Sequence, residues 1–172
     1  MKLHLGCGPN YRAGWLNVDI DSSCADLLHD LRSPLPFESE SVSHIYNEHF
    51  FEHLTLQEGA AFLKECRRVL IKGGVLRIST PDLRWLIEQY VSGAVDEWKD
   101  VDWLPLTPCQ LLNEGVRSWG HLFVYDQDEL CVALSAAGFN EVRKVGWRTS
   151  VHPEMCDMES RPFHRELIVE AA

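Results

Sequence analysis

Short apolar runs alternate with longer helix-forming stretches along this chain, and that alternation limits the fold more than any other feature of the sequence. Runs at residues 2–5, 15–20, 25–29 and 43–47 have the length and composition of buried strands. Such strands, each followed by a crossover connection, predict βαβ units and a mostly parallel sheet. We therefore expect a single α/β domain over residues 1–172, built on a doubly wound sheet.

The middle of the chain continues the pattern with clear helix signals. Thr55 and Glu58 form a capping box at the start of a helix. Gly73-Gly74 is expected to end that helix before a fifth strand at residues 75–79. Pro81 is expected at the first position of the next helix, where its missing N–H costs nothing.

The last third of the chain contains one helix and two short strands by the same criteria. Residues 126–137 have helical spacing and are followed by Gly138, a common helix terminator. Alternating segments at residues 141–145 and 166–170 predict two strands joined by a long loop. An antiparallel C-terminal edge strand is therefore expected on the otherwise parallel sheet.

The composition excludes several kinds of partner. The formal net charge is −10, and Lys and Arg are scattered, so the basic stripe that nucleic-acid binding requires is missing. No apolar run is long enough for a signal peptide or a bilayer span, so a cytoplasmic location without a membrane partner is expected. The six cysteines form no C-x-x-C pair, which agrees with free thiols in a reducing compartment. Oligomeric state is not indicated.

Polar residues and glycines stand at the ends of the first two predicted strands, where sheets of this kind bind ligands. The glycines of Gly6-Cys7-Gly8 allow the backbone to approach a ligand without an intervening Cβ, although a simple tight turn explains them too. Asp19 ends the second strand and can accept both hydroxyls of a ribose; a solvated acidic loop is the alternative. Together, a glycine turn and an acid on the next strand are the two halves of a nucleoside site.

The third strand ends in a similar combination. Asp30 can accept a hydrogen bond from an adenine amino group while Leu31 packs on the ring. The alternative is that Asp30 only caps a turn, a role that Asp favours.

The ordered set of motifs resembles a known family. The segments LHLGCG, LNVDID, LLHDL, IYNEHFFEHL and WGHLFVYDQDEL occur in this order and resemble the class I S-adenosylmethionine-dependent methyltransferases, in particular the small bacterial type-11-like group often linked with cell-surface glycan pathways. The resemblance covers nearly the whole chain. It implies a Rossmann-like methyltransferase fold, S-adenosylmethionine as cofactor, and methyl transfer to a small-molecule or glycan acceptor.

The resemblance also implies where the cofactor binds. The implied residues all follow one of the first four strands: Gly6, Cys7, Gly8, Asp19, Ile20, Asp30, Leu31 and Asn47. The glycine turn would pass under the methionine part, and Asp19 would bind the ribose with Ile20 beside the adenine. Asp30 and Leu31 would hold the adenine. Asn47 and the residues just after it would face the sulfonium and the acceptor.

The chain departs from the family pattern after the first strand. Pro9-Asn10 replaces the last glycine of the usual motif, and only ten residues separate Gly8 from Asp19. A full crossover helix does not fit in that length, so we expect this helix to be reduced to about a turn or lost. A methyltransferase-like binding module that has lost turnover is therefore a rival interpretation.

Two histidines are candidates for the acceptor side of the site. Much of the catalysis of methyl transfer can come from orientation, but a hydroxyl acceptor also benefits from a base that titrates near neutral pH. His49, just after the fourth strand, can supply such a base; a structural hydrogen bond is its alternative role. His121 is the second candidate, with simple packing before the next helix as its alternative.

The stretch His49-Phe50-Phe51-Glu52-His53 also matches H-x-x-E-H, the inverted zinc-protease motif. On a helix, His49 and His53 would share one face and bind zinc, with Glu52 as the base of a hydrolase. The stretch follows a strand directly, however, where a helix has barely begun. We therefore favour the methyltransferase interpretation and expect no metal.

Two longer segments complete the expectations. Residues 91–120 are expected to include a lid over the acceptor. Trp98, Trp103 and Trp119 in or beside it can stack on a sugar or aromatic ring, and the apolar underside of a cap explains them equally well. Residues 152–164 contain His, Cys and acidic residues at irregular spacing and are expected to form a plain surface loop.

Overall fold

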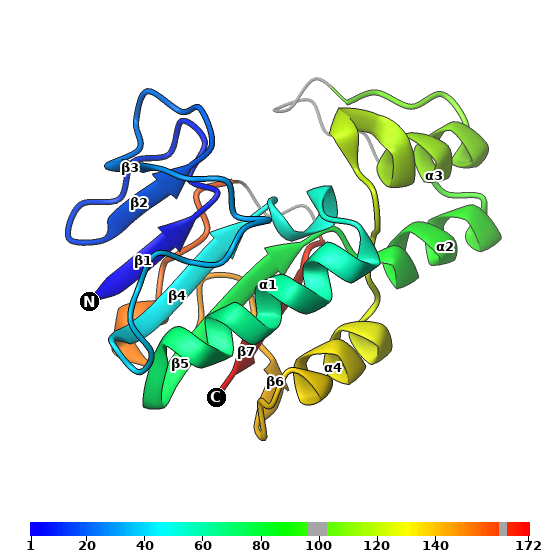
Figure 1. Ribbon diagram of the computed structural model, residues 1–172. Coiled ribbons are helices and arrows are strands. Elements are labelled where there is room, and N and C mark those ends of the chain that lie inside the picture. The colour runs from blue at the N-terminus through cyan, green and yellow to red at the C-terminus, as the bar shows by residue number, and fades with distance from the viewer. Residues whose placement is uncertain (96–102, 162–164) are drawn as a thin grey trace.

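The computed structural model describes residues 1–95, 103–161 and 165–172, and within them seven strands form one sheet (Figure 1). The order across the sheet is β3-β2-β1-β4-β5-β7-β6. The strands are β1 (Lys2–Leu5), β2 (Leu16–Asp19), β3 (Leu27–Leu28), β4 (Val42–Glu48), β5 (Leu70–Thr80), β6 (Val142–Lys144) and β7 (Leu167–Ala171). All neighbouring pairs are parallel except those made by β7, which runs antiparallel to both β5 and β6. The predicted fold class is confirmed, with the antiparallel strand β7 lying just inside the edge strand β6.

Four α-helices occur in the described residues: α1 (Leu56–Val69), α2 (Leu83–Ser92), α3 (Pro108–Arg117) and α4 (Gln127–Ala136). The predicted capping box is present, since the Thr55 side chain accepts from Glu58 N and the Glu58 carboxylate accepts from Thr55 N. Helices α2 and α3 pack together beyond the ends of the parallel strands (Figure 1). None of the helices in the described part of the chain has the length and apolar character needed to cross a membrane.

Two predicted helix boundaries are wrong. Helix α1 ends at Val69 and β5 begins at Leu70, so Gly73-Gly74 lies inside β5, at an irregularity in its pairing with β4. The strand begins before the glycines because Leu70 is almost fully buried and pairs with Val42 of β4. Pro81 precedes α2, because the Asp82 side chain accepts from Arg84 N and makes Asp82 the N-cap.

Helices α1 and α4 cover one face of the sheet, which we call the helical face (Figure 1). Alternate residues of the central strands point to this side, and most of them are apolar, as in Leu3, Leu5, Ile45, Leu76 and Ile78. All are fully buried in one core together with side chains of the two helices: Phe62, Leu63, Cys66, Leu130 and Leu134. This face holds the main hydrophobic core.

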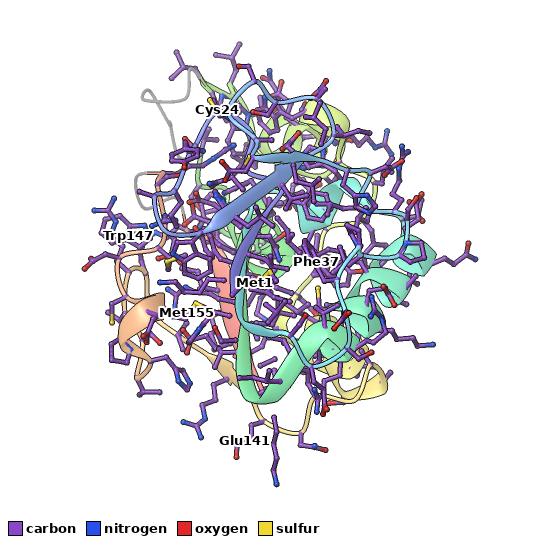
Figure 2. The ribbon with its side chains drawn as sticks, turned by 60° about the vertical axis from the view of Figure 1, so that its left-hand side comes forward. Met1, Cys24, Phe37, Glu141, Trp147 and Met155 are labelled. Atoms are coloured by element: carbon purple, nitrogen blue, oxygen red, sulfur yellow. The ribbon has the colours of Figure 1, made fainter. Side chains whose placement is uncertain are left out.

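The opposite face has a different cover. Residues 6–15, all described by the structure, form turns without a helix, which confirms the predicted loss of the first crossover helix. The described chain between β6 and β7, which we call the β6–β7 segment (residues 145–161 and 165–166), packs on this side instead. Its Met155 and Met158 are buried against Trp15 and Tyr46, and Figure 2 shows Met155 and Trp147 on the side of the sheet away from α1.

A buried ion network fastens the β6–β7 segment. Arg77 of β5 is fully buried, and its Nε and Nη1 donate to Glu159 Oε1 at 2.7 Å and Glu170 Oε1 at 2.6 Å. Nη1 also donates to the Thr149 carbonyl. The plain surface loop expected at residues 152–164 is therefore wrong for the described residues 152–161, because Glu159 is needed to balance a buried guanidinium. Residues 162–164 lie outside the described part.

Candidate active site

The turn after β1 depends on glycine. Gly6 and Gly8 have φ values of +70° and +50°, a region that glycine adopts without steric cost. A Cβ on Gly6 would lie 2.6 Å from Cγ of Phe50, whereas none of the described residues comes within 4 Å of a Cβ built on Gly8. Cys7 between them is buried, and burial raises the pKa of its thiol. The turn therefore presents open backbone at Gly8 and an unreactive thiol below it.

Asp19 joins the two halves of the predicted nucleoside site directly. Its Oδ2 accepts from Gly8 N at 2.8 Å, and its Oδ1 accepts from Ile20 N at 2.8 Å. Oδ1 also accepts from Asp21 N at 3.3 Å, whereas Oδ2 keeps a further lone pair. The acid at the end of β2 thus holds the turn after β1 in place and can still accept a ligand hydroxyl.

A cavity of about 330 Å³ lies against this turn, at the carboxyl ends of β1 and β2. Five of the residues predicted to bind the cofactor line it: Gly6, Gly8, Asp19, Ile20 and Leu31. The rest of the lining comes from Arg32 and the connection between β4 and α1: His49, Phe50, His53 and Leu54. We call this the first cavity.

Three predicted cofactor residues do not line the first cavity. Asp30 forms a two-pronged ion pair with Arg32 (Nη2 to Oδ2, 2.7 Å) and accepts from Arg32 N. The hydrogen bonds from Arg32 lower the pKa of Asp30 to about 2, so this carboxylate has the turn-capping role. Cys7 lies behind the turn. Asn47 is fully buried on β4, and its amide group makes no hydrogen bond within the described chain.

A second cavity of about 320 Å³ adjoins the first, and His49 and His53 line both. Both predicted catalytic residues, His49 and His121, line this second cavity. Its wall includes three indole rings and three carboxylates: Trp85, Trp103, Trp119, Glu52, Asp82 and Glu166. Arg161 and Arg165 of the β6–β7 segment also line it. Trp103 and Trp119 belong to the predicted lid, whereas Trp98 lies outside the described residues.

His49 is held between two buried carboxylates. Its Nδ1 lies 3.1 Å from Glu52 Oε1, and its Nε2 lies 3.5 Å from Glu166 Oε1. Burial disfavours the protonated ring, but Glu166 and Glu52 outweigh burial and raise the pKa of His49 to about 9. A raised pKa favours the protonated ring, which disfavours the predicted role of His49 as a base near neutral pH. Its φ of +49° is also unusual for a residue with a side chain.

The inverted zinc motif has the wrong geometry. Residues Phe51–His53 form one turn of 3₁₀-helix instead of the continuous α-helix the motif needs, because the chain enters α1 only after Thr55. Both ring nitrogens of His49 face carboxylates. His49 and His53 therefore do not form the predicted zinc pair.

Glu52 connects the site to the chain after α3. Its side chain is fully buried and accepts from the Thr80 hydroxyl at 3.1 Å. Its backbone carbonyl accepts from Leu122 N at 2.8 Å and Phe123 N at 3.2 Å. This places His121 beside Glu52, with His121 Nε2 3.9 Å from Glu52 Oε1. Burial lowers the pKa of His121, so its ring is neutral at pH 7.

Comparisons with known proteins agree with this geometry. Residues 3–78 match the family model described as a methyltransferase domain, a range that runs from β1 through most of β5. No curated protein matches the chain by sequence.

Solved structures share the fold. An S-adenosylmethionine-dependent methyltransferase from Thermotoga maritima, described as a possible histamine N-methyltransferase, has 16% identity and a TM-score of 0.60, with 99% of this chain and 80% of that chain covered. A methyltransferase from Archaeoglobus fulgidus has 14% identity and a TM-score of 0.61, with coverages of 99% and 84%. One from Mesorhizobium loti has 17% identity and a TM-score of 0.59, with coverages of 99% and 89%.

The partial family match and the shared fold point to the same class of protein. Residues 3–78 match a methyltransferase domain, and the chain has the fold of S-adenosylmethionine-dependent methyltransferases. Its cofactor is S-adenosylmethionine, and the residues present fit that group. The open backbone at Gly8 leaves room for the methionine part, Asp19 can accept from the ribose, and Leu31 offers an apolar surface to the adenine.

Several site residues could not be found from the sequence. Asp82 was seen only as part of a helix start, while Glu166, Arg161 and Arg165 gave no local signal. Glu166 and Arg161 come from the β6–β7 segment, more than a hundred residues away from His49. Glu52 and His53 did stand out, but as members of a zinc motif.

Proposed function

We propose that the protein transfers the methyl group of S-adenosylmethionine to a small-molecule or glycan-type acceptor bound in the second cavity. The observation that carries this proposal is the contact between the two cavities at His49 and His53. A cofactor in the first cavity and an acceptor in the second would meet at these two side chains. Such mutual positioning accounts for much of the catalysis of a bimolecular transfer.

The wall of the second cavity supports a compact, polar acceptor. Its volume of about 320 Å³ is at the lower end for small-molecule sites. The rings of Trp103 and Trp119 meet edge to face with centroids 5.1 Å apart, and indoles of this kind stack on the apolar face of a sugar or on an aromatic ring. Buried carboxylates such as Glu52 can accept from hydroxyl or amine donors on the acceptor.

In this proposal, the side chains of the protein bind and orient the cofactor and the acceptor. The cofactor, when bound, supplies an electrophilic methyl group. Asp19 and the glycine turn hold the nucleoside side, and the tryptophans exclude water from the acceptor side. His49 has its pKa raised by the neighbouring carboxylates, which favours the protonated ring, and it keeps Glu52 and Glu166 in place at the junction.

Calorimetry tests the cofactor half of the proposal. Wild-type protein should bind S-adenosylmethionine and S-adenosylhomocysteine, and Asp19→Ala should weaken both by roughly 10- to 100-fold, because a charge-assisted contact to the ribose is lost. Asp19→Asn, which keeps the shape, should also bind more weakly. The matched control is Asp21→Ala, two residues away and outside the cavity lining. Equal affinities for all four proteins would contradict the assignment of Asp19.

An isotope-transfer assay tests the acceptor half. Labelled S-adenosylmethionine is offered with a panel of sugars, hydroxylated aromatics and small amines, with protein and nucleic acid included. We expect a labelled small-molecule or glycan product, and a higher KM for that acceptor in Trp119→Ala. Trp147→Ala, outside both cavities, should behave as wild type. Label found only in protein or nucleic acid would refute the proposed acceptor class.

A further inference from the structure

Three side chains of the second cavity form a group that the transfer reaction does not itself require. They are Glu52, His53 and His121, and one ligand atom from each lies within 4.8 Å of the other two. Two come from the connection between β4 and α1, and the third follows α3. Two imidazoles and one carboxylate are a donor set that Zn²⁺ and other divalent transition metals favour.

His121 is oriented as a metal-binding histidine would be. Its Nδ1 lies 2.9 Å from the Gly115 carbonyl oxygen. Because a carbonyl only accepts, Nδ1 carries the proton, and the neutral ring has its lone pair on Nε2. That Nε2 atom is the one that lies 3.9 Å from Glu52 Oε1. A backbone carbonyl that fixes the tautomer in this way is typical of histidine metal ligands.

Glu52 brings a buried carboxylate oxygen that is not fully satisfied. The side chain is completely buried, and Oε2 accepts from the Thr80 hydroxyl. Oε1 lies 3.1 Å from His49 Nδ1 as an ion pair, but makes no well-formed hydrogen bond within the described residues. A buried carboxylate without full compensation is costly. The same Oε1 atom lies 3.9 Å from His121 Nε2.

His53 is the adjustable member of the group. Its ring meets the His121 ring edge to face, with centroids 5.2 Å apart. Neither of its ring nitrogens forms a hydrogen bond with any residue that the structure describes, so it can turn without breaking one. Zn–N and Zn–O bonds of about 2.0–2.2 Å require the three donor atoms to approach one another by about 1 Å, which a rotation of this partly exposed ring can supply.

We propose that Glu52, His53 and His121 bind one divalent transition-metal ion of the Zn²⁺ type, with coordination positions open to the second cavity. All three residues line that cavity, so an open position can take an oxygen or nitrogen atom of the acceptor. This last role rests on the proposed function, whereas the metal site does not. His49 is outside the ligand set, because both its nitrogens face carboxylates.

The experiment uses the metal alone, without cofactor or acceptor. Chelator-treated wild-type protein is titrated with ZnCl₂ by calorimetry and with CoCl₂ by visible absorption spectroscopy. We expect one equivalent to bind, and a Co²⁺ spectrum of a low-coordinate nitrogen–oxygen site without a thiolate charge-transfer band. His53→Ala and His121→Ala should each weaken binding at least about tenfold, since each removes a ligand. His152→Ala, remote from both cavities, should leave it unchanged.

Two outcomes would overturn the metal site. One is a wild-type affinity equal to that of the double variant His53→Ala/His121→Ala, and the other is a thiolate band that assigns the ion to cysteines. Circular dichroism confirms folding of each variant. If His121→Ala does not fold, His53→Ala decides alone, because the His53 ring makes no hydrogen bond that folding would lose. Cofactor binding is measured separately, so failure here leaves the proposed function standing, and the reverse holds as well.

Discussion

The two faces of the sheet are buried by different means. The helical face is covered by α1 and α4, and the strands send Leu, Ile and Val to it. On the other face the same strands place His4, Asn17, Tyr46 and Arg77, all with exposures of 3% or less. Tyr46 and Arg77 lie beneath the β6–β7 segment. An alternation of apolar and polar residues usually means that the polar side faces water. Here the polar side is buried as well.

The difference lies in what holds each cover in place. Apolar packing on the helical face is non-directional, and each side chain contributes a share. The polar cover depends on pairs such as Arg77 with Glu159, where removal of one partner leaves the other charge buried. The two covers meet at His49, between Glu52 on the side of α1 and Glu166 at the end of the β6–β7 segment. Both cavities lie at that meeting point.

The largest effect is expected on the polar face. Arg77→Ala should lower the free energy of unfolding by about 3–5 kcal/mol, because Glu159 and Glu170 would remain buried without a cation. Urea denaturation measures this, with Arg84→Ala as control, since Arg84 pairs with Asp128 on the surface and should contribute no more than about 1 kcal/mol. The comparison of the faces fails if Arg77→Ala and Arg84→Ala cost the same.

A slightly smaller effect is expected on the helical face. Leu63→Ala should lower the free energy of unfolding by about 3 kcal/mol, through lost apolar burial and the cavity left behind. Lys64→Ala, the exposed neighbour on the same helix, should change it by less than about 0.5 kcal/mol. The loss in Leu63→Ala should be the same at pH 5 and pH 7. A loss that shrinks at pH 5 would show that this face, too, depends on charge.

The junction should show a pH-dependent contribution of the same order as the Leu63→Ala loss, at most, spread over a wide pH range. The pKa of His49 is raised to about 9 in the folded protein, so the folded state holds this proton more tightly than the unfolded state. The resulting stability is fully present below about pH 6.5 and is lost as pH rises to about 9. In a chelating buffer, the difference in unfolding free energy between wild type and His49→Gln should therefore shrink across this range. If this difference stayed constant with pH, the folded state would not hold the His49 proton more tightly than the unfolded state.

The smallest effect is expected at the start of α1. Thr55→Ala removes the side-chain cap that accepts from Glu58 N and should cost about 1 kcal/mol. Thr55→Ser, which keeps the hydroxyl, should cost much less. Thermal unfolding followed by circular dichroism compares the two variants. Equal losses would mean that the capping box does not stabilise the helical face.

Much of the fold could be predicted from the sequence because its signals are local. The first strand was predicted with the bounds that β1 has, and the Thr55 capping box and the missing first crossover helix are confirmed. The glycine turn and Asp19 were predicted as two halves of one site, and Gly8 and Asp19 are hydrogen-bonded. Alternation within strands, side-chain capping and chain length between strands all act over a few residues, so they can be recognised in sequence.

Only the tertiary structure decided the charge state and partners of the acceptor side. The protonated form of His49 is favoured because Glu166 arrives from the far end of the chain, and Glu159 is buried because Arg77 lies beneath its loop. His121 reaches Glu52 through backbone hydrogen bonds to Leu122 and Phe123. A pKa or an ion pair depends on which groups are brought together after folding, across separations that no local pattern encodes. The sequence thus determined the sheet and its glycine turn, and folding determined which charged groups meet beside them.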